Sequence, residues 1–190
     1  MHQGVVAFCR LGLRTRSIAL APSPGWSAEA APLLLVLDGI TDVHNFGACL
    51  RSADAAGAHG VVVPKDRAAP LNATVRKVAC GAAESVPVYR VTNLARALAR
   101  MKEMGVWVTG TAGEAEAELY DADFTGATAL VMGAEGKGMR RLTREAAMAW
   151  SSCPWQDRWP ASMCRWPPAS ACSRRYGSEG RGSAETKLGA

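Results

Sequence analysis

The sequence predicts an α/β fold in which a parallel sheet carries helices on both faces. Apolar runs such as 33–37 and 60–64 are hydrophobic throughout, as expected for strands that are buried on both sides. Segments with helical spacing separate these runs, and residues typical of helix ends bound them. With 190 residues, 48% hydrophobic and 21% charged, the chain has the size and composition of one globular domain.

Strands and helices are expected to alternate along the chain. The first strand is predicted over 33–37, and the helix that follows it ends at Gly57. Further strands are predicted over 60–64, 86–91, 106–110 and 129–133, with helical segments over 69–84, 93–105 and 142–150. Parallel sheets bind ligands at the carboxyl ends of their strands, so the loops after Leu37, Val108 and Met132 are the candidate sites.

The loop and helix after the first strand contain an amide, a glycine and an arginine. Asn45 is suited to capping the helix, and Gly47 leaves room for another group to approach closely. Arg51 falls near the second turn, and its long side chain leans back toward the helix N-terminus. Taken singly, Asn45 is explained as a helix cap and Arg51 as a solvated arginine. Their interpretation as functional residues therefore depends on the other loops.

The loop 131–139 holds three glycines in six positions and one acid, Glu135. No Ser or Thr follows its Gly-Lys pair and the GxGxxG spacing is absent, which argues against ATP and NAD sites. A glycine-rich turn lets the main chain wrap around a ligand such as adenosine, and it equally suits a tight strand-to-helix turn. The small-residue loop 108–116 ends at the same sheet edge, either as a ligand loop or as a plain surface loop.

Charge, cysteine usage and hydropathy exclude several classes of protein. The net charge of +5 comes from the two ends of the chain, with +2 in 1–30 and +3 in 151–190, so it is weak evidence for nucleic-acid binding. The six cysteines form no CxxC pair, which argues against a zinc site and a secreted disulfide framework. No apolar run spans a bilayer, and we expect a cytoplasmic protein.

Three segments together are more specific than any one of them. The pattern N-x-G-x-x-x-R at 45–51, GTAGEAE at 110–116 and LVMGAEGKGMRRLTRE at 130–145 resembles the SpoU/TrmH family of RNA 2′-O-ribose methyltransferases, in the knotted SPOUT superfamily. The resemblance runs from about Pro32 to Glu145. Residues 2–8 also resemble the junction where the catalytic domain begins in members that methylate a guanosine of 23S rRNA.

The resemblance implies a SPOUT (trefoil-knot type) methyltransferase domain, S-adenosyl-L-methionine as cofactor, RNA (rRNA) as substrate, a homodimer and no metal. The implied catalytic residues are Asn45, Arg51 and Glu135, and the implied cofactor-binding residues are Gly110, Thr111 and Gly133. Family members complete the cofactor pocket with a third motif close to Pro-Met-Ala-Gly-Ser-Val-Ala-Ser-Leu-Asn-Val-Ser-Val-Ala. That motif should follow the helix ending near Trp150, and it is not in this sequence.

The segment in its place, CPWQDRWPASMCRWPPASACSRR at 153–175, has no strand or helix period. Trp and Met each have one codon, so the codons read across four residue boundaries in a shifted frame are fixed. Trp155–Gln156, Trp159–Pro160 and Trp166–Pro167 give alanine, and Met163–Cys164 gives valine, each where the missing motif requires it. The other codons permit the rest of the motif in order. We therefore expect a frameshift between about Glu145 and Ala149.

This interpretation divides the chain into three parts. Residues 1–30 are expected to be a partly irregular N-terminal linker remnant, 31–150 the SPOUT methyltransferase domain, and 151–190 an out-of-frame, disordered tail. The knot-forming C-terminal segment is then missing and this copy is expected to be inactive. The alternatives are a Trp/Arg-rich tail that stacks on RNA bases, and a noncatalytic RNA-binding or ribosome-assembly protein on the same fold.

Overall fold

A seven-stranded parallel sheet forms the centre of the molecule, with strand order β1-β4-β3-β2-β6-β5-β7. The computed structural model describes residues 15–17, 31–134, 136 and 138–152. The strands are β1 Thr15–Ser17, β2 Leu33–Asp38, β3 Gly60–Pro64, β4 Val88–Val91, β5 Trp107–Thr111, β6 Thr128–Gly133 and β7 Ala149–Ser151. Every described pair of neighbouring strands is parallel, which confirms the predicted fold class.

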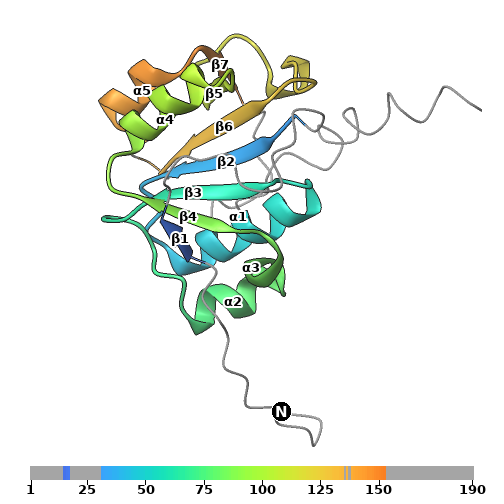
Figure 1. Ribbon diagram of the computed structural model, residues 1–190, viewed down its shortest axis with the longest axis vertical. Coiled ribbons are helices and arrows are strands. Elements are labelled where there is room, and N and C mark those ends of the chain that lie inside the picture. Colours follow the sequence, from blue (N-terminus) through green and yellow to red (C-terminus); the bar gives the residue numbers. More distant parts are fainter. Residues whose placement is uncertain (1–14, 18–30, 135, 137, 153–190) are drawn as a thin grey trace, which may run out of the picture.

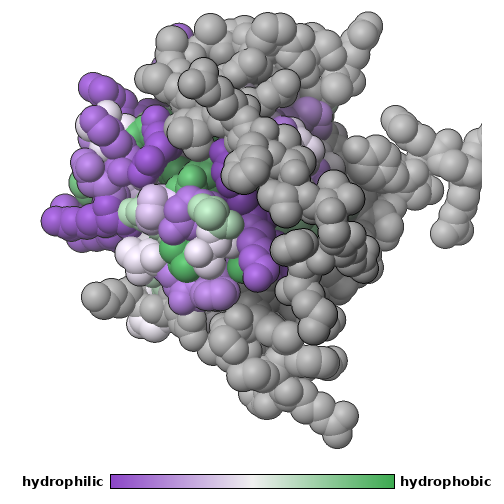
Figure 2. All heavy atoms as spheres, turned by 90° about the horizontal axis from the view of Figure 1, so that it is seen from below, coloured by the Kyte–Doolittle hydropathy of each residue, from purple (hydrophilic) through white to green (hydrophobic). Residues whose placement is uncertain are grey.

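Helices cover both faces of the sheet, as Figure 1 shows. The helices are α1 Val43–Ala55, α2 Ala73–Ala79, α3 Ala82–Ser85, α4 Leu94–Glu103 and α5 Arg141–Ala146, with a short 3-10 helix η1 Leu119–Asp121. The first three lie together on one face, and α4 and α5 pack against each other on the opposite face. The described surface beside α1 to α3 is mostly hydrophilic with small hydrophobic areas (Figure 2).

Each central strand contributes to two hydrophobic cores, because alternate side chains of a strand point to opposite faces. Leu33, Leu35 and Leu37 of β2 pack with α1 to α3, whereas Leu34 and Val36 pack with α4. This double burial explains why the strands are apolar without alternation. It also fixes the register, since a shift of one residue would exchange the two cores.

The helix boundaries differ in two places from the sequence prediction. The predicted helical segment 69–84 is two helices, because Cys80 is left-handed (φ 52°) and Gly81 follows with φ 97°. The predicted helix 142–150 was wrong at its end, since α5 stops at Ala146 and Trp150 belongs to β7. A six-residue helix leaves the next residues free to pair with β5 as an added strand.

Asn45 does not cap α1, contrary to the prediction. Asp42 is the N-cap, and its Oδ1 accepts the main-chain N–H groups of His44 (2.6 Å) and Asn45 (2.9 Å). A carboxylate satisfies two of the otherwise unpaired N–H groups of the first turn, so it takes the cap position. Asn45 lies inside the first turn instead and is 8% exposed.

β1 lies within 1–30, where no strand was predicted, and pairs with β4 at the sheet edge. The predicted disordered tail, 151–190, lies outside the described residues from 153 onward. The two remaining tail residues, Ser151 and Ser152, continue β7 and its pairing.

Candidate functional site

A buried carboxylate organises the carboxyl edge of the sheet. Asp38 is the last residue of β2 and lies opposite Gly133, the last residue of β6. Its side chain is fully buried and accepts hydrogen bonds from the main-chain N–H of Arg140 (2.9 Å) and from the Nε of Arg140 (2.6 Å). A second guanidinium nitrogen, Nη2, lies 2.6 Å from Asp38 Oδ1. Asp38 therefore fixes the residue that closes the glycine-rich loop.

The glycine-rich loop is a tight turn between Gly133 and Arg140. Ala134 and Gly138 exchange main-chain hydrogen bonds of 3.0 and 2.8 Å. A Cβ on Gly133 would lie 2.4 Å from the carbonyl carbon of Gly138, so no larger residue fits beneath the turn. Gly136 and Gly138 have φ angles of +73° and +63°, and a Cβ on either would point into open space. At these two positions the turn thus presents main chain without a side chain.

A cavity of about 570 Å³ opens between this turn and the loops after β2 and β3. Its walls are Asp38, Gly39, Ile40, Thr41, Asp42, Asn45, Arg67, Ala134, Gly138, Met139 and Arg140. A hydrogen bond from Ala69 N–H to the Ile40 carbonyl (2.8 Å) ties the β3 loop to the β2 loop. The sequence analysis singled out Asn45 from this wall but missed Asp38, Arg67 and Arg140. The detectable signal was Asp38, an acid placed directly after a buried strand.

The proposed catalytic residues are distributed unevenly around this cavity, which we call the rim cavity. Asn45 lines it, whereas Arg51 lies on the exposed side of α1 in line with His44, two turns along the helix. Arg51 lines neither cavity described here. The structure does not describe Glu135, which follows Ala134 in the turn.

The proposed cofactor residues lie on neighbouring strands. Gly133 ends β6, and Gly110 and Thr111 end β5 beside it. The Thr111 hydroxyl donates to the Val131 carbonyl (3.2 Å), which joins the two strand ends. A Cβ on Gly110 would lie 2.7 Å from the ring of Trp150, so packing against β7 already requires glycine there.

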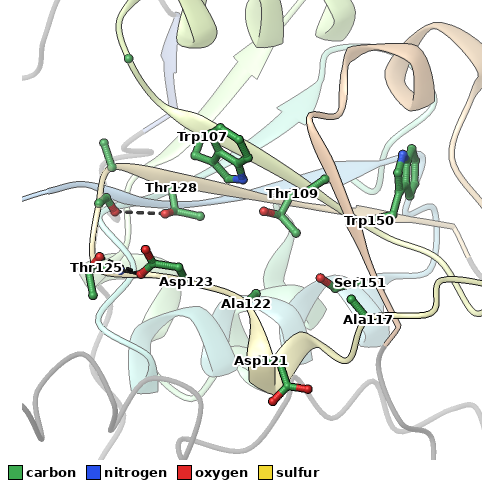
Figure 3. A pocket seen from close by; sticks show the side chains of 14 residues that line it. Trp107, Thr109, Ala117, Asp121, Ala122, Asp123, Thr125, Thr128, Trp150 and Ser151 are labelled. Atoms are coloured by element: carbon green, nitrogen blue, oxygen red, sulfur yellow. Dashed lines mark hydrogen bonds between the residues drawn. The ribbon is translucent and has the colours of Figure 1, made fainter.

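A second cavity, of about 550 Å³, lies against β5, β6 and β7 on the same side of the sheet as α1 (Figure 3). Thr109, Thr128 and Ser151 are buried along its strand side, and Trp107 is 48% exposed at its margin. The loop 117–127 forms its other wall. Its lining contains no Lys or Arg among the described residues, so it lacks the charge that a nucleic acid would require. We call it the face cavity.

The end of β7, beside the face cavity, pairs with the loop between β5 and β6. The main chain of Ser152 pairs with the β5–β6 loop, donating to the Ala117 carbonyl (2.7 Å) and accepting from Leu119 N–H (2.8 Å). β7 is therefore held between β5 on one side and this loop on the other.

Two carboxyl groups near the site have lowered pKa values. A hydrogen bond from Arg144, with a main-chain hydrogen bond and the Arg144 charge, lowers the pKa of Glu114 in the β5 loop. The main-chain N–H and hydroxyl of Thr125 lower the pKa of Asp123. Arg144 also lies 4.9 Å from the centre of the Trp150 ring, so it links α5, β7 and the β5 loop.

Within the described residues, no three His, Cys, Asp or Glu side chains converge as metal ligands would. The described helices are also all too short or too polar to cross a membrane.

Comparison with known proteins identifies the family. The model of the SpoU rRNA methylase family matches residues 32–160, which include every described residue of the rim cavity. The chain belongs to the SpoU rRNA methylase family. It is 60% identical over 146 residues to the 23S rRNA (guanosine-2′-O-)-methyltransferase RlmB of Photorhabdus laumondii, covering 76% of this chain and 59% of that protein. RlmB of Pseudomonas aeruginosa is 57% identical over 155 residues, covering 76% and 58%.

The chain thus spans about six-tenths of the length of these relatives. Solved structures of SpoU proteins share the fold. The methyltransferase AviRb of Streptomyces viridochromogenes has a TM-score of 0.65 at 25% identity, covering 78% of this chain and 61% of that one. A TrmH-family protein of Porphyromonas gingivalis has a TM-score of 0.62 at 27% identity, covering 78% and 62%. A second AviRb structure, with a TM-score of 0.68 at 24% identity over 79% and 63%, contains AdoMet.

Proposed function

We propose that this chain derives from an S-adenosyl-L-methionine-dependent methyltransferase that modifies the ribose 2′-hydroxyl of a guanosine in 23S rRNA. The observation that carries this proposal is the 57–60% identity to RlmB proteins of several bacteria, over 144 residues or more. Identity of this level in a SpoU domain supports the same substrate class. An rRNA substrate also supports a cytoplasmic location.

The described residues fit an adenosine-containing cofactor in one respect. Gly136 and Gly138 adopt left-handed backbone, and a side chain at either would project into open space, so a flat ligand can approach the main chain there. We propose that Gly133, with the neighbouring Gly110 and Thr111, holds the cofactor through main-chain groups. When bound, S-adenosyl-L-methionine supplies an electrophilic methyl group.

The residues of the chain have to align and activate the ribose hydroxyl. Asn45 lines the rim cavity from the first turn of α1, and we propose that its amide orients a ribose or a base. Arg51 is effectively always protonated, so we assign it to phosphate positioning or to stabilisation of the developing oxyanion rather than to proton removal. Glu135 is proposed to position RNA or to order the glycine turn.

We further propose that this copy is inactive because its reading frame shifts near residue 147. The proposed out-of-frame tail lacks the serine and asparagine of the third motif, which complete the cofactor pocket in the family. In the shifted frame, the four codons fixed by Trp and Met match that motif, and the other codons permit it. Resequencing the gene tests this directly, and a single uninterrupted frame through Trp166 contradicts it.

A paired experiment separates the family function from the loss of function. The chain as it stands and a version whose frame is corrected by one nucleotide near codon 147 are each titrated calorimetrically with S-adenosyl-L-methionine. Both are then assayed for methyl transfer to a 23S rRNA fragment. We expect micromolar binding and transfer only in the corrected version. Transfer by the uncorrected chain contradicts inactivity, and no transfer by either contradicts the methyltransferase proposal.

A noncatalytic RNA-binding role is the second candidate, favoured by the loss of the third motif from a chain that keeps the fold. Filter binding of the uncorrected chain to the same RNA at rising salt tests it. RNA affinity without methyl transfer supports this role. The homodimer of the intact family is likewise a proposal for the corrected chain, tested by sedimentation.

A further inference from the structure

We propose that Arg67 is an RNA-positioning residue that binds a backbone phosphate of the substrate at the rim cavity. This inference rests on the proposed function, because it assumes that RNA is the substrate. On this proposal, RNA binds at the part of the rim cavity that the loop after β3 forms.

The position of Arg67 is fixed by its loop. The residue follows β3, and two residues later Ala69 is buried and hydrogen-bonded to the Ile40 carbonyl (2.8 Å). This contact holds the loop against the start of α1. Arg67 lines the same cavity as Asn45 while remaining exposed to solvent. A ligand in the cavity therefore meets an arginine on a fixed loop.

The guanidinium of Arg67 has no ion-pair partner among the described residues. The two carboxylates of the wall are engaged elsewhere, Asp38 with the guanidinium of Arg140 and Asp42 with two N–H groups of α1. Asp66, the neighbour of Arg67, is exposed and no described ion pair includes it. Among the described residues, no hydrogen bond or ion pair engages the Arg67 side chain either. The guanidinium donors of Arg67 are thus available to a ligand in the cavity, and their fork geometry suits a phosphate.

The backbone of Arg67 points to the same conclusion. Its φ of +60° is left-handed, one of two such non-glycine residues in the described chain. An L side chain is unfavourable in this conformation, and glycine would adopt it without strain. No described contact of the Arg67 side chain explains why this position holds an arginine and not a glycine. The strained conformation is consistent with a role outside the folded chain, in binding.

Two anions could reach this arginine, a phosphodiester of RNA or the carboxylate of the cofactor. The sheet order favours RNA, because β3 is separated from β6 by β2 and from β5 by β2 and β6. With strands about 4.8 Å apart, Arg67 follows a strand about 10 Å from the glycine turn and about 14 Å from Thr111. The proposed cofactor residues Gly133, Gly110 and Thr111 therefore belong to strands on the far side of β2 from β3.

The test measures RNA affinity against salt concentration for Arg67→Gly, Arg67→Lys and a control, Arg96→Ala. Arg96 is exposed on α4, on the other face of the sheet, with no described side-chain partner. Losing one phosphate contact lowers the slope of log affinity against log salt by about 0.7 for single-stranded RNA. We expect this decrease in slope and a several-fold loss of affinity for Arg67→Gly only, with the slope retained in Arg67→Lys.

Thermal unfolding and cofactor titration complete the test. Because glycine relieves the left-handed strain, Arg67→Gly should keep or raise the Tm while it weakens RNA binding, which a merely structural role does not predict. In the frame-corrected protein, Arg67→Gly should leave the affinity for S-adenosyl-L-methionine unchanged. An unchanged salt slope, or a loss of cofactor affinity instead, overturns the inference. If the frame-corrected protein transfers methyl groups and Arg67→Gly leaves the salt slope of RNA binding unchanged, only the role of Arg67 is contradicted. If the frame-corrected protein transfers no methyl group, the proposed function itself is contradicted.

Discussion

Gly133 is the residue on which the glycine-rich turn closes. A methyl group there would lie 2.4 Å from the Gly138 carbonyl carbon and 2.5 Å from the Met139 nitrogen, and both are main-chain atoms. We predict that Gly133→Ala lowers the free energy of unfolding by about 2 kcal/mol, since the turn has to move to admit it. Gly113→Ala is the matched control, because a Cβ there meets nothing within 4 Å and φ is not positive. Urea unfolding measures both, and equal stability of the two variants contradicts the prediction.

Asp38 tests whether a buried charge pair holds the loop in place. Asp38→Asn keeps the size of the side chain but removes the charge that Arg140 faces through three contacts. We predict a loss of about 2 kcal/mol, the scale of hydrogen bonds to charged groups. Glu103→Gln on α4 removes a carboxylate from an exposed pair with Arg100 and should cost less than about 0.5 kcal/mol. Hydrogen exchange at Gly138 should also quicken in Asp38→Asn alone.

At the scale of elements, the sequence predicted the central strands and α4 well, because local signals determine them. Double burial makes β2 and β3 apolar throughout, and Asn93 caps α4 as expected, accepting from Arg96 N–H (3.0 Å). The misassigned elements depend on tertiary contacts. β7 forms only because 149–151 pair with β5, and a left-handed Cys80 splits the predicted second helix. Neither cause is visible in hydrophobic spacing.

The contact between the β5 loop and α5 should depend on pH. Arg144 holds the pKa of Glu114 below its usual range, so the folded state binds this proton less tightly than the unfolded chain does. The stabilisation is then present above the unfolded pKa, about 4.3, and is lost as the pH falls through the lower folded value. We predict that Glu114→Gln slightly lowers the Tm at pH 7, and that the difference shrinks below about pH 4.3 and disappears below the lowered folded pKa. A difference that persists in acid contradicts this assignment.

For the molecule as a whole, the sequence predicted the edge of the sheet at which the candidate site lies but not its composition. Asn45 and Gly133 were expected at the carboxyl edge, and both adjoin the rim there. The sequence did not predict Arg67 and Arg140 as site residues, because folding brings their loops together across the sheet. Asp38 and Arg140, for example, are 102 residues apart in the sequence. Residue spacing alone did not show that the three loops form one site. The resemblance to a family indicated this.

The face cavity gives the proposed frameshift a physical consequence that can be measured. Within the described residues, no α-helix lines this cavity, and Trp107 is 48% exposed beside it. In the shifted frame, the permitted codons continue the motif into an apolar segment suited to a helix. Ser151 lines the cavity, so the restored motif and the segment after it would follow directly from the cavity wall.

We therefore predict that the frame-corrected protein buries Trp107 and unfolds at a higher temperature than the uncorrected chain. Burial of apolar area contributes about 25 cal/mol per Å², so covering even 100 Å² adds about 2.5 kcal/mol. Acrylamide quenching of Trp107, with the other tryptophans replaced by phenylalanine in both proteins, reports the burial, and calorimetry reports the Tm. A surface dye for apolar patches should bind the uncorrected chain more strongly. Equal quenching in the two proteins would show that the restored segment lies elsewhere, and the cavity would then need another explanation.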